Sequence, residues 1–523
     1  MVLLGWIASL LTVAGIFYAH APIFGHDNAA LAPSLHEMEL AWRQFGVLDM
    51  DFSPFRCLGL PVFSNPNSIV WSIFQPLALL FGSSPFTVYA VCAIFVSVAF
   101  FGAFRLAVRL GLSVSSAVLM ALGWSLQGFG VTHLVAGHAS YLQFLLLPFF
   151  LDILMRATPG WIALGAVSFT WAHLLFTSGY YILIAALPSL VLGYAFLRWF
   201  LSEKQLEGST WRSFLRNFFT AGFIAILMSG PKILGSLNFT ALFPREAALE
   251  RVGLWKGFVY TLSQYVWPFP WDIRAFTGWW YGNWESYEFF LPLVLFLLVW
   301  KLSRKGVDSV LRQRAAIAFG VLLVTGTLLS SGALAPIFSV LPIFKSLHVN
   351  PRWNGFVFLP AFVLVLVLLS RLGVKKFPPA WSLALSVAFI ATPFFYLDRG
   401  EMQIMYTFNA GIAPDSTRLP YCYEPIFGYG LEQFPLGTQQ HWITAPLADP
   451  RCYLKSNGCR PGVRFGEEGR DIEGAAKLER YELKDETPKV RWWKPFALAL
   501  YLAGAACALY FAFMLIRESL GRR

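Results

Sequence analysis

Long apolar segments recur from one end of the chain to the other, and they constrain its fold more than any other feature. A helix needs about 20 apolar residues to cross a bilayer, and about twelve segments approach this length. They lie near 2–22, 85–105, 113–132, 140–156, 160–177, 180–198, 216–235, 288–301, 314–331, 354–371, 380–397 and 494–515. Only 13% of the residues are charged, against about a quarter in soluble domains. The sequence therefore predicts an all-α integral membrane protein with about twelve transmembrane helices.

Two of the apolar segments need a separate interpretation. The first contains Ala19-His20-Ala21, which resembles a signal-peptidase site. No basic residue precedes its apolar run, so a retained first helix is favoured over a cleaved signal peptide. A further segment at 69–82 contains Pro76 and is too short to cross a bilayer, so we expect it to be interfacial or re-entrant.

The basic residues predict which helix ends face the cytoplasm. They follow the second, fourth, sixth, eighth, tenth and last apolar segments as Arg105, Arg109, Arg156, Arg198, Lys204, Arg212, Arg216, Lys301, Arg304, Lys305, Arg312, Arg314, Arg371, Lys375, Lys376, Arg517, Arg522 and Arg523. By the positive-inside rule, both termini are then cytoplasmic. The net charge of +11 is interpreted as this topology signal. No nucleic-acid-binding motif is recognisable, so we expect no nucleic-acid partner.

This orientation divides the chain into four parts. Residues 1–235 are expected to form an N-terminal membrane module that includes the outer loop 23–68, and 236–397 a second membrane region with outer loops 236–287 and 332–353. Residues 398–493 are polar and rich in Gly and Pro, which predicts a small extracytoplasmic domain. Residues 494–523 are the last helix and a basic cytoplasmic tail.

The cysteines agree with this assignment of sides. Cys57, Cys422, Cys452 and Cys459 lie in the outer segments, where disulfides persist. A Cys452–Cys459 bridge is favoured because Asn457-Gly458 supports a tight turn between them. Four cysteines allow three pairings, so the sequence leaves open whether one or two disulfides form.

Polar residues concentrate in the outer segments rather than within the membrane. Transporters usually retain ionisable residues at mid-membrane, whereas the main exceptions in these apolar segments are Lys232 and His173. In the first outer loop, LAPSLHEMELAWRQFG has helical apolar spacing and predicts an amphipathic surface helix. This layout suits chemistry on a lipid-borne substrate.

Several short motifs resemble those of bacterial GT-C-class glycosyltransferases. The first is an Asp after the opening helix, followed by a surface helix, GLPVFSNPNSIVW and a short apolar segment. VTHLVAGHASYLQFLLLPFFLDILMRA is similar to a Gly-His motif of that class, and WESYEFFLPLVLFLL, NPRWNGFVFLP and CYEPIFGYG resemble its outer-loop junctions. The resemblance implies a GT-C-like bundle in the bacterial cytoplasmic membrane. It also implies transfer of a sugar from a polyprenyl-phosphate donor to an extracytoplasmic glycan, lipid or protein acceptor.

Asp27 matches the acid of this class and is the expected general base, which accepts the proton of the acceptor hydroxyl. The alternative is that it caps a helix starting near Asn28. Asp49 and Asp51 are candidates for a second acid or metal ligand, or else solvated turn residues. The sequence leaves open whether a divalent cation such as Mg²⁺ or Mn²⁺ is needed, with Asp27 and Asp51 as the ligands to consider.

Arg352 is the strongest candidate for the donor phosphate, because a guanidinium can contact two phosphate oxygens at once. Lys232 is the second choice, and His348 adds to the same basic patch; interfacial anchoring is the alternative for both Arg352 and Lys232. His133 and His138 flank Gly137 and either contact substrate or satisfy carbonyls of the turn.

Glu285 lies in the aromatic-rich stretch 265–290, which is typical of a membrane-interface belt but is also suited to orienting an acceptor glycan. Two other functions remain open at this point. One is a lipid or glycan transporter, and the other is a non-enzymatic membrane scaffold for envelope assembly.

Overall fold

The computed structural model describes residues 1–20, 68–82, 85–136, 138–177, 180–242, 252–266, 307–334, 355–373, 377–397 and 488–521. It also describes shorter pieces at 23–24, 35, 38–39, 42–43, 46–47, 52–53, 60–61, 63–66, 294, 298, 301–303, 336, 406–407, 421–422 and 441–442. The predicted extracytoplasmic domain at 398–493, most of the outer loops and most of the predicted span 288–301 therefore lie outside the described residues.

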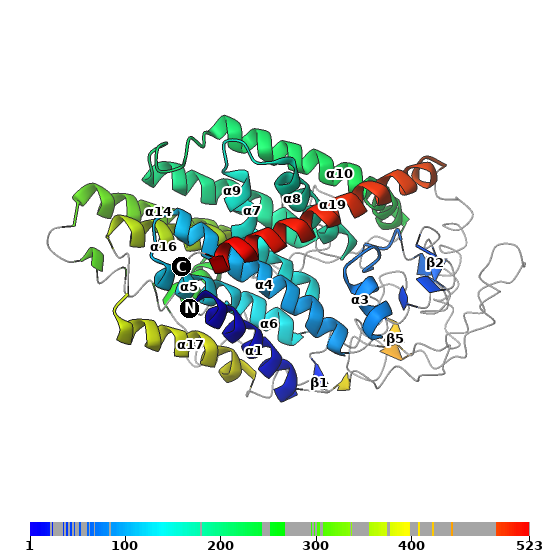
Figure 1. Ribbon diagram of the computed structural model, residues 1–523, viewed down its shortest axis with the longest axis horizontal. Helices are drawn as coiled ribbons and strands as arrows, with labels where there is room; N and C mark the ends of the chain where they lie inside the picture. The colour runs from blue at the N-terminus through cyan, green and yellow to red at the C-terminus, as the bar shows by residue number, and fades with distance from the viewer. Residues whose placement is uncertain are drawn as a thin grey trace, which may run out of the picture.

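Helices make up nearly all of the described regular structure (Figure 1). They are α1 (Val2–His20), α3 (Phe74–Phe81), α4 (Pro85–Arg109), α5 (Val114–Ser125), α6 (Gly128–Ala136), the 3₁₀ helix η1 (Ala139–Leu146), α7 (Leu147–Leu154), α8 (Trp161–Phe176), α9 (Tyr180–Phe200), α10 (Trp211–Leu242), α11 (Leu254–Val266), α14 (Ser309–Ser330), α16 (Gly355–Arg371), α17 (Pro379–Leu397) and α19 (Pro488–Gly521). The described strands are two residues long and pair antiparallel: β1 (Ile23–Phe24) with β4 (Tyr406–Thr407), β2 (Phe52–Ser53) with β3 (Leu60–Pro61), and β5 (Tyr421–Cys422) with β6 (His441–Trp442).

Five described segments are long and apolar enough to cross a bilayer: Phe86–Arg109, Val114–Val131, Trp211–Phe239, Ser309–Ser330 and Trp492–Gly521. Shorter apolar helices accompany them, among them α1, α8 and α16. The helical character predicted from the sequence is thus confirmed for the described residues, and the five long apolar helices are compatible with a helical membrane protein. The number of twelve crossings stays a prediction.

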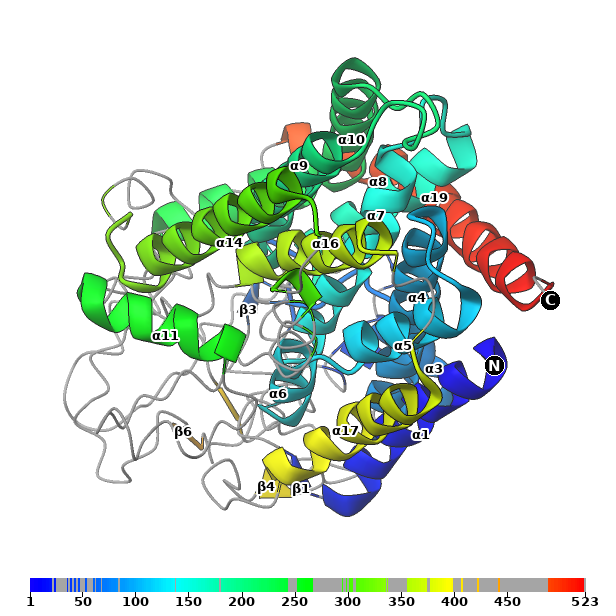
Figure 2. The same cartoon turned by 90° about the vertical axis from the view of Figure 1, so that its left-hand side faces the viewer.

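The helices form one bundle in which segments distant in sequence lie side by side (Figures 1 and 2). The last helix, α19, packs against α8 and α10, while α1 packs against α4, α5 and α17. The two ends of the chain come near one another at the same end of the bundle. The bundle is closed tightly at Gly102, where a Cβ would lie 2.7 Å from the Cβ of Phe149 on α7.

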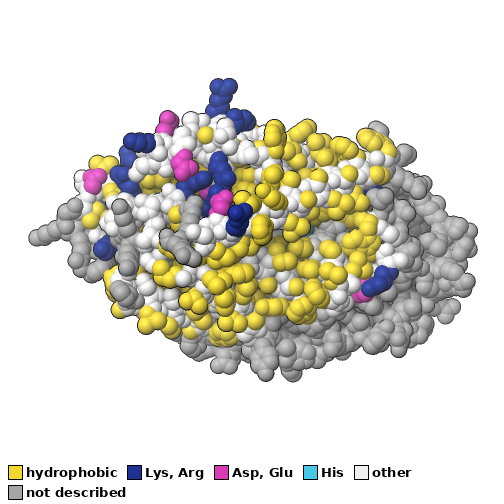
Figure 3. Space-filling model, in the orientation of Figure 1, with side chains coloured by type: hydrophobic (Ala, Val, Ile, Leu, Met, Phe, Trp, Pro, Cys, Tyr) yellow, Lys and Arg dark blue, Asp and Glu magenta, His cyan; other side chains and the backbone are white. Residues whose placement is uncertain are grey.

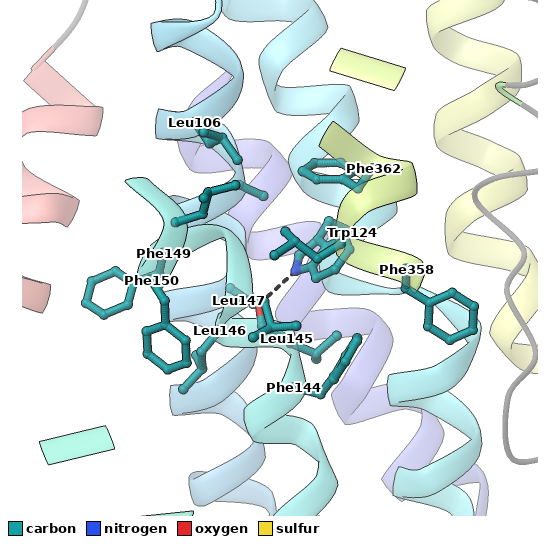
Figure 4. Close-up of a cluster of buried hydrophobic side chains, with 14 of the residues drawn as sticks. Leu106, Trp124, Phe144, Leu145, Leu146, Leu147, Phe149, Phe150, Phe358 and Phe362 are labelled. Carbon is teal, nitrogen blue, oxygen red and sulfur yellow. Dashed lines mark hydrogen bonds between the residues drawn. The ribbon is translucent and has the colours of Figure 1, made fainter. Parts of the chain in front are cut away.

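Two predicted spans are discontinuous helices that face each other. The segment 113–132 is α5 and α6 with a break at Leu126 and Gln127, and 140–156 is η1 followed by α7. Pro148 explains the second break: it has no N–H to donate to the carbonyl of Phe144, which accepts from the N–H of Leu147 in a tighter turn instead. Trp124 joins the two breaks, since its indole Nε1 donates to the carbonyl oxygen of Leu145 at 2.7 Å (Figure 4).

The segment predicted to be interfacial contains a turn at 70–73 followed by α3, which is 8 residues long. In the predicted surface helix of the first outer loop, the described positions Leu35, Met38, Glu39, Trp42 and Arg43 have helical backbone or lie in helical turns. Leu35 and Met38 are buried, whereas Arg43 is exposed and pairs with Glu39 at 3.1 Å. These positions follow the amphipathic pattern.

Candidate functional site

One end of the bundle carries a network of arginines around a single buried carboxylate, and we call it the arginine-rich end. Asp152 on α7 is 2% exposed. Its carboxylate oxygens lie 3.2 Å from Arg105 Nε, 3.0 Å from Arg109 Nη1 and 2.8 Å from Arg156 Nη2. Glu518 on α19 lies 2.7 Å from Arg105 Nη1, so the network ties the last helix to α4 and α7. Charged side chains gather over this end of the surface (Figure 3).

A group of polar residues lies toward the opposite end of the bundle, and we call it the polar layer. Its described members are Asn65, Ser68, His133, His138, Gln143, His173, Thr177, Lys232 and Lys494. Helix geometry gives the separation from the arginine-rich end. In α10, Asn217 Nδ2 donates to the carbonyl of Arg156, and Lys232 follows roughly 22 Å further along the helix. In α19, Lys494 precedes Glu518 by roughly 36 Å.

His133 and His138 lie within hydrogen-bonding distance of each other at the turn between α6 and η1. Their Nδ1 atoms lie 2.8 Å apart, and the backbone N–H of His138 donates to the carbonyl of His133. One ring therefore donates to the other, because only one hydrogen fits between the two nitrogens. The His133 ring is fully buried and stacks on Tyr141 with 4.2 Å between centroids. The pair is thus packed into the start of η1.

His173 joins three elements of the polar layer. Its Nε2 accepts the backbone N–H of Ile73 at 2.9 Å, and its Nδ1 lies 2.7 Å from Gln143 Oε1. The first contact requires an unprotonated Nε2, so Nδ1 carries the hydrogen and donates to Gln143. Gln143 Nε2 in turn donates to Thr177 Oγ1 at 2.7 Å. His173 therefore fastens the turn before α3 to α8 and η1.

The described residues of the segment 63–73, which begins within the motif GLPVFSNPNSIVW and ends two residues after it, are held from both sides. On one side, Lys232 Nζ donates to the carbonyl of Asn65 at 2.6 Å and to Ser68 Oγ at 2.7 Å. On the other, Trp71 contacts Phe176 on α8 with 5.3 Å between the ring centroids, and within the segment it contacts Phe63 at 5.0 Å. Trp71 also has a φ of +54°, a left-handed conformation that costs about 1–3 kcal/mol for a non-glycine residue. The surrounding contacts offset the cost of this strained conformation at Trp71.

Only some of the predicted site residues are described. His133, His138 and Lys232 lie in the polar layer. Lys232 is 1% exposed, so in this structure its ammonium is directed into the protein and binds the segment 63–73. The other predicted site residues lie outside the described residues: Asp27, Asp49, Asp51, Glu285, His348, Arg352, Cys452 and Cys459. Their roles, including Asp27 and Asp51 as ligands of a divalent cation, stay predictions. The described part of the chain contains no group of three metal-binding side chains.

Three residues with a clear structural role were not singled out from the sequence. Asp152 lies inside a predicted span, and its signal was an arginine four residues later, the spacing of one helical turn. Lys494 follows two tryptophans and is the first residue of the last predicted span, 494–515, where a lysine is an ordinary feature of a helix end. Gln143 has no sequence signal of its own, because a single buried amide is identified only by its partners.

Comparison with known proteins adds nothing to this picture: no protein-family model matches the chain, and searches of curated proteins and of solved structures find no significant match.

Proposed function

We propose that this protein transfers a sugar from a polyprenyl-phosphate donor to an acceptor outside the cytoplasm. The observation that supports this most is the polar layer, which gathers histidines, lysines and a fixed segment at one end of an apolar bundle. The phosphate of a membrane lipid lies where the bilayer meets water, because the hydrocarbon chain of the lipid stays in the bilayer while its headgroup is hydrated. The arginine-rich end would then be cytoplasmic under the positive-inside rule.

In this proposal the general base is Asp27, which accepts the proton of the acceptor hydroxyl as the glycosidic bond forms. The sugar–phosphate bond breaks in the same step, and the polyprenyl phosphate leaves as an anion. Arg352, with His348, would stabilise that negative charge. His133 and His138 would border the site, with Asp49, Asp51 and Glu285 supplied by the outer loops. The segment 63–73, fixed by Lys232 and His173, would form its floor.

Sugar transfer from a labelled polyprenyl-phosphate donor in proteoliposomes tests the proposal. Asp27→Asn and Arg352→Gln should each reduce the rate at least 100-fold, because a positioned base or charge contributes about this much. Asp308→Asn and Arg371→Gln are matched controls. Asp308 caps α14 by accepting from the N–H of Val310, a role that Asn also fills, and Arg371 is exposed at the end of α16.

Two results would contradict the proposal. If the Asp27 and Arg352 variants keep the full rate, neither residue takes part in the reaction. If sealed vesicles show flux of the lipid or glycan without a new glycosidic bond, the protein is a transporter.

A further inference from the structure

The outward face of α10 carries a row of exposed apolar side chains, which we call the apolar row. It consists of Leu215, Phe219, Phe223 and Ile226, which are 37%, 65%, 62% and 54% exposed. These positions repeat every three or four residues and therefore share one face of the helix. The other face is packed into the bundle, and its buried residues are Phe214, Asn217, Ala221, Ala225 and Met228. Because α10 is long and apolar enough to cross a bilayer, we expect the apolar row to contact lipid.

The apolar row has the length of one leaflet and begins at two arginines. Leu215 and Ile226 are separated by roughly 17 Å along the helix, and the hydrocarbon of one leaflet is about 15 Å deep. Arg212 and Arg216 are both exposed and lie one turn apart at the start of the row. Trp161, 77% exposed, begins the neighbouring helix α8. Arginine and tryptophan at the end of an apolar surface are typical of the level of lipid headgroups, and Figure 3 shows charged side chains giving way to hydrophobic ones.

The guanidinium of Arg216 is held in place by neutral groups. Its Nη2 donates to the carbonyl oxygen of Ala157 at 2.6 Å and to Asn217 Oδ1 at 3.3 Å. The Asn217 amide is itself fixed, because its Nδ2 donates to the carbonyls of Leu154 and Arg156. These bonds leave both N–H groups of Arg216 Nη1 without a partner among the described residues. An oriented donor pair thus remains at the exposed start of the apolar row.

The charges of Arg212 and Arg216 are not offset by a carboxylate in the described part of the chain. Each described acid has another role. Asp308 caps α14, and the others pair with arginines outside this pair: Glu39 with Arg43, Asp152 with Arg105, Arg109 and Arg156, Glu203 with Arg198, Glu207 with Arg109, and Glu518 with Arg105. The two arginines at the start of the apolar row therefore match an amphiphile with an anionic head.

We propose that Arg212 and Arg216 bind the phosphate of an anionic glycerophospholipid in the leaflet at the arginine-rich end, with an acyl chain along the apolar row. The guanidinium of Arg212 and Nη1 of Arg216 supply N–H groups to the phosphate oxygens. A zwitterionic lipid carries its own cation beside the phosphate, so the anionic lipid is preferred. This site is independent of the proposed sugar transfer, and a protein without transferase activity would retain it.

The test titrates the full chain in detergent micelles with dioleoylphosphatidylglycerol, and native mass spectrometry gives the dissociation constant of the first bound lipid. The double variant Arg212→Gln, Arg216→Gln should bind about 10- to 100-fold more weakly than wild type, the usual effect of removing charged hydrogen-bonding groups. The control is Lys204→Gln, Arg371→Gln, which removes the same charge from exposed positions at the same end and should bind as wild type does. Dioleoylphosphatidylcholine should bind weakly to every variant.

Equal losses in the double variant and in its control would show that only the net charge of this end matters, and would overturn the site. Phosphatidylcholine binding as tightly as phosphatidylglycerol would overturn it too. Glycerol phosphate, which has no acyl chain, should not compete at equal concentration; if it does, the apolar row contributes nothing and the lipid assignment is wrong. Thermal unfolding shows whether each variant is folded. Arg212→Gln alone, at a side chain without a partner among the described residues, keeps the test decisive if the double variant does not fold, and should bind about 3- to 10-fold more weakly.

Discussion

Gly230 on α10 lies directly against the ring of Trp493 on α19, so closely that no other residue fits at position 230 without movement. Gly230→Ala should therefore push α19 away from α10. Because the clash is with a rigid ring, we expect destabilisation of about 1–3 kcal/mol, measured by thermal unfolding in detergent. Gly320→Ala is the control: Gly320 lies within α14 with nothing within 4 Å of its Cβ position. That change should stabilise by up to about 1 kcal/mol through helix propensity. Equal effects of the two substitutions would contradict the packing argument.

The indole of Trp124 joins the two helix breaks through its hydrogen bond to the carbonyl of Leu145 (Figure 4). Trp124→Phe keeps an aromatic ring beside Phe362, 4.7 Å away in the wild type, but leaves the carbonyl of Leu145 without this donor. The loss should cost about 1–3 kcal/mol, the usual penalty for a buried polar group that loses its partner. Trp161→Phe, at a side chain that is 77% exposed, should change the unfolding temperature little. An unchanged transition for Trp124→Phe would mean that the carbonyl finds another donor.

The two breaks also show what the sequence could and could not predict. Apolar length identified 113–132 and 140–156 as membrane segments, because burying a helix requires apolar residues whatever its detailed path. The way the two breaks are joined depends on a contact between Trp124 and the carbonyl of Leu145, which lies on the other segment. Periodicity in a single segment contains no information on such a contact.

The residues of the candidate site also differ in whether the sequence alone can identify them. His133, His138 and Lys232 were identified because polar residues beside apolar runs are conspicuous. Gln143 and Lys494 could not be identified in this way. The role of Gln143 depends on His173, 30 residues away, and that of Lys494 on the ring of Phe63 in the first outer loop. The sequence also could not indicate that Lys232 would bind the segment 63–73 through its ammonium.

Replacing His173 tests whether its two hydrogen bonds hold the turn before α3 against α8 and η1. His173→Phe fills similar space but leaves both the N–H of Ile73 and Oε1 of Gln143 without this partner. Two such buried groups should cost about 2–6 kcal/mol together, and hydrogen exchange should speed up across 68–75. Ser168→Ala on the same helix is the control, since Ser168 Oγ donates to the carbonyl of Leu164 one turn earlier in α8 and, among the described residues, to no other element. Faster exchange confined to α8, with 68–75 unchanged, would show that His173 does not hold that segment.

Asp152 is the only described acid that contacts Arg105, Arg109 and Arg156 together, and Asp152→Asn should be strongly destabilising. The three arginine side chains are 14–19% exposed, so water screens them poorly. Removing the carboxylate leaves them repelling one another, and breaking a buried ion pair in this way costs about 3–5 kcal/mol.

The control is Glu203→Gln. Glu203 pairs with Arg198, and its side chain is 63% exposed, so this substitution should lower the free energy of unfolding by less than about 1 kcal/mol. Thermal unfolding of both variants decides the matter. If Asp152→Asn unfolds at the temperature of Glu203→Gln, the arginine network contributes no more than a surface pair.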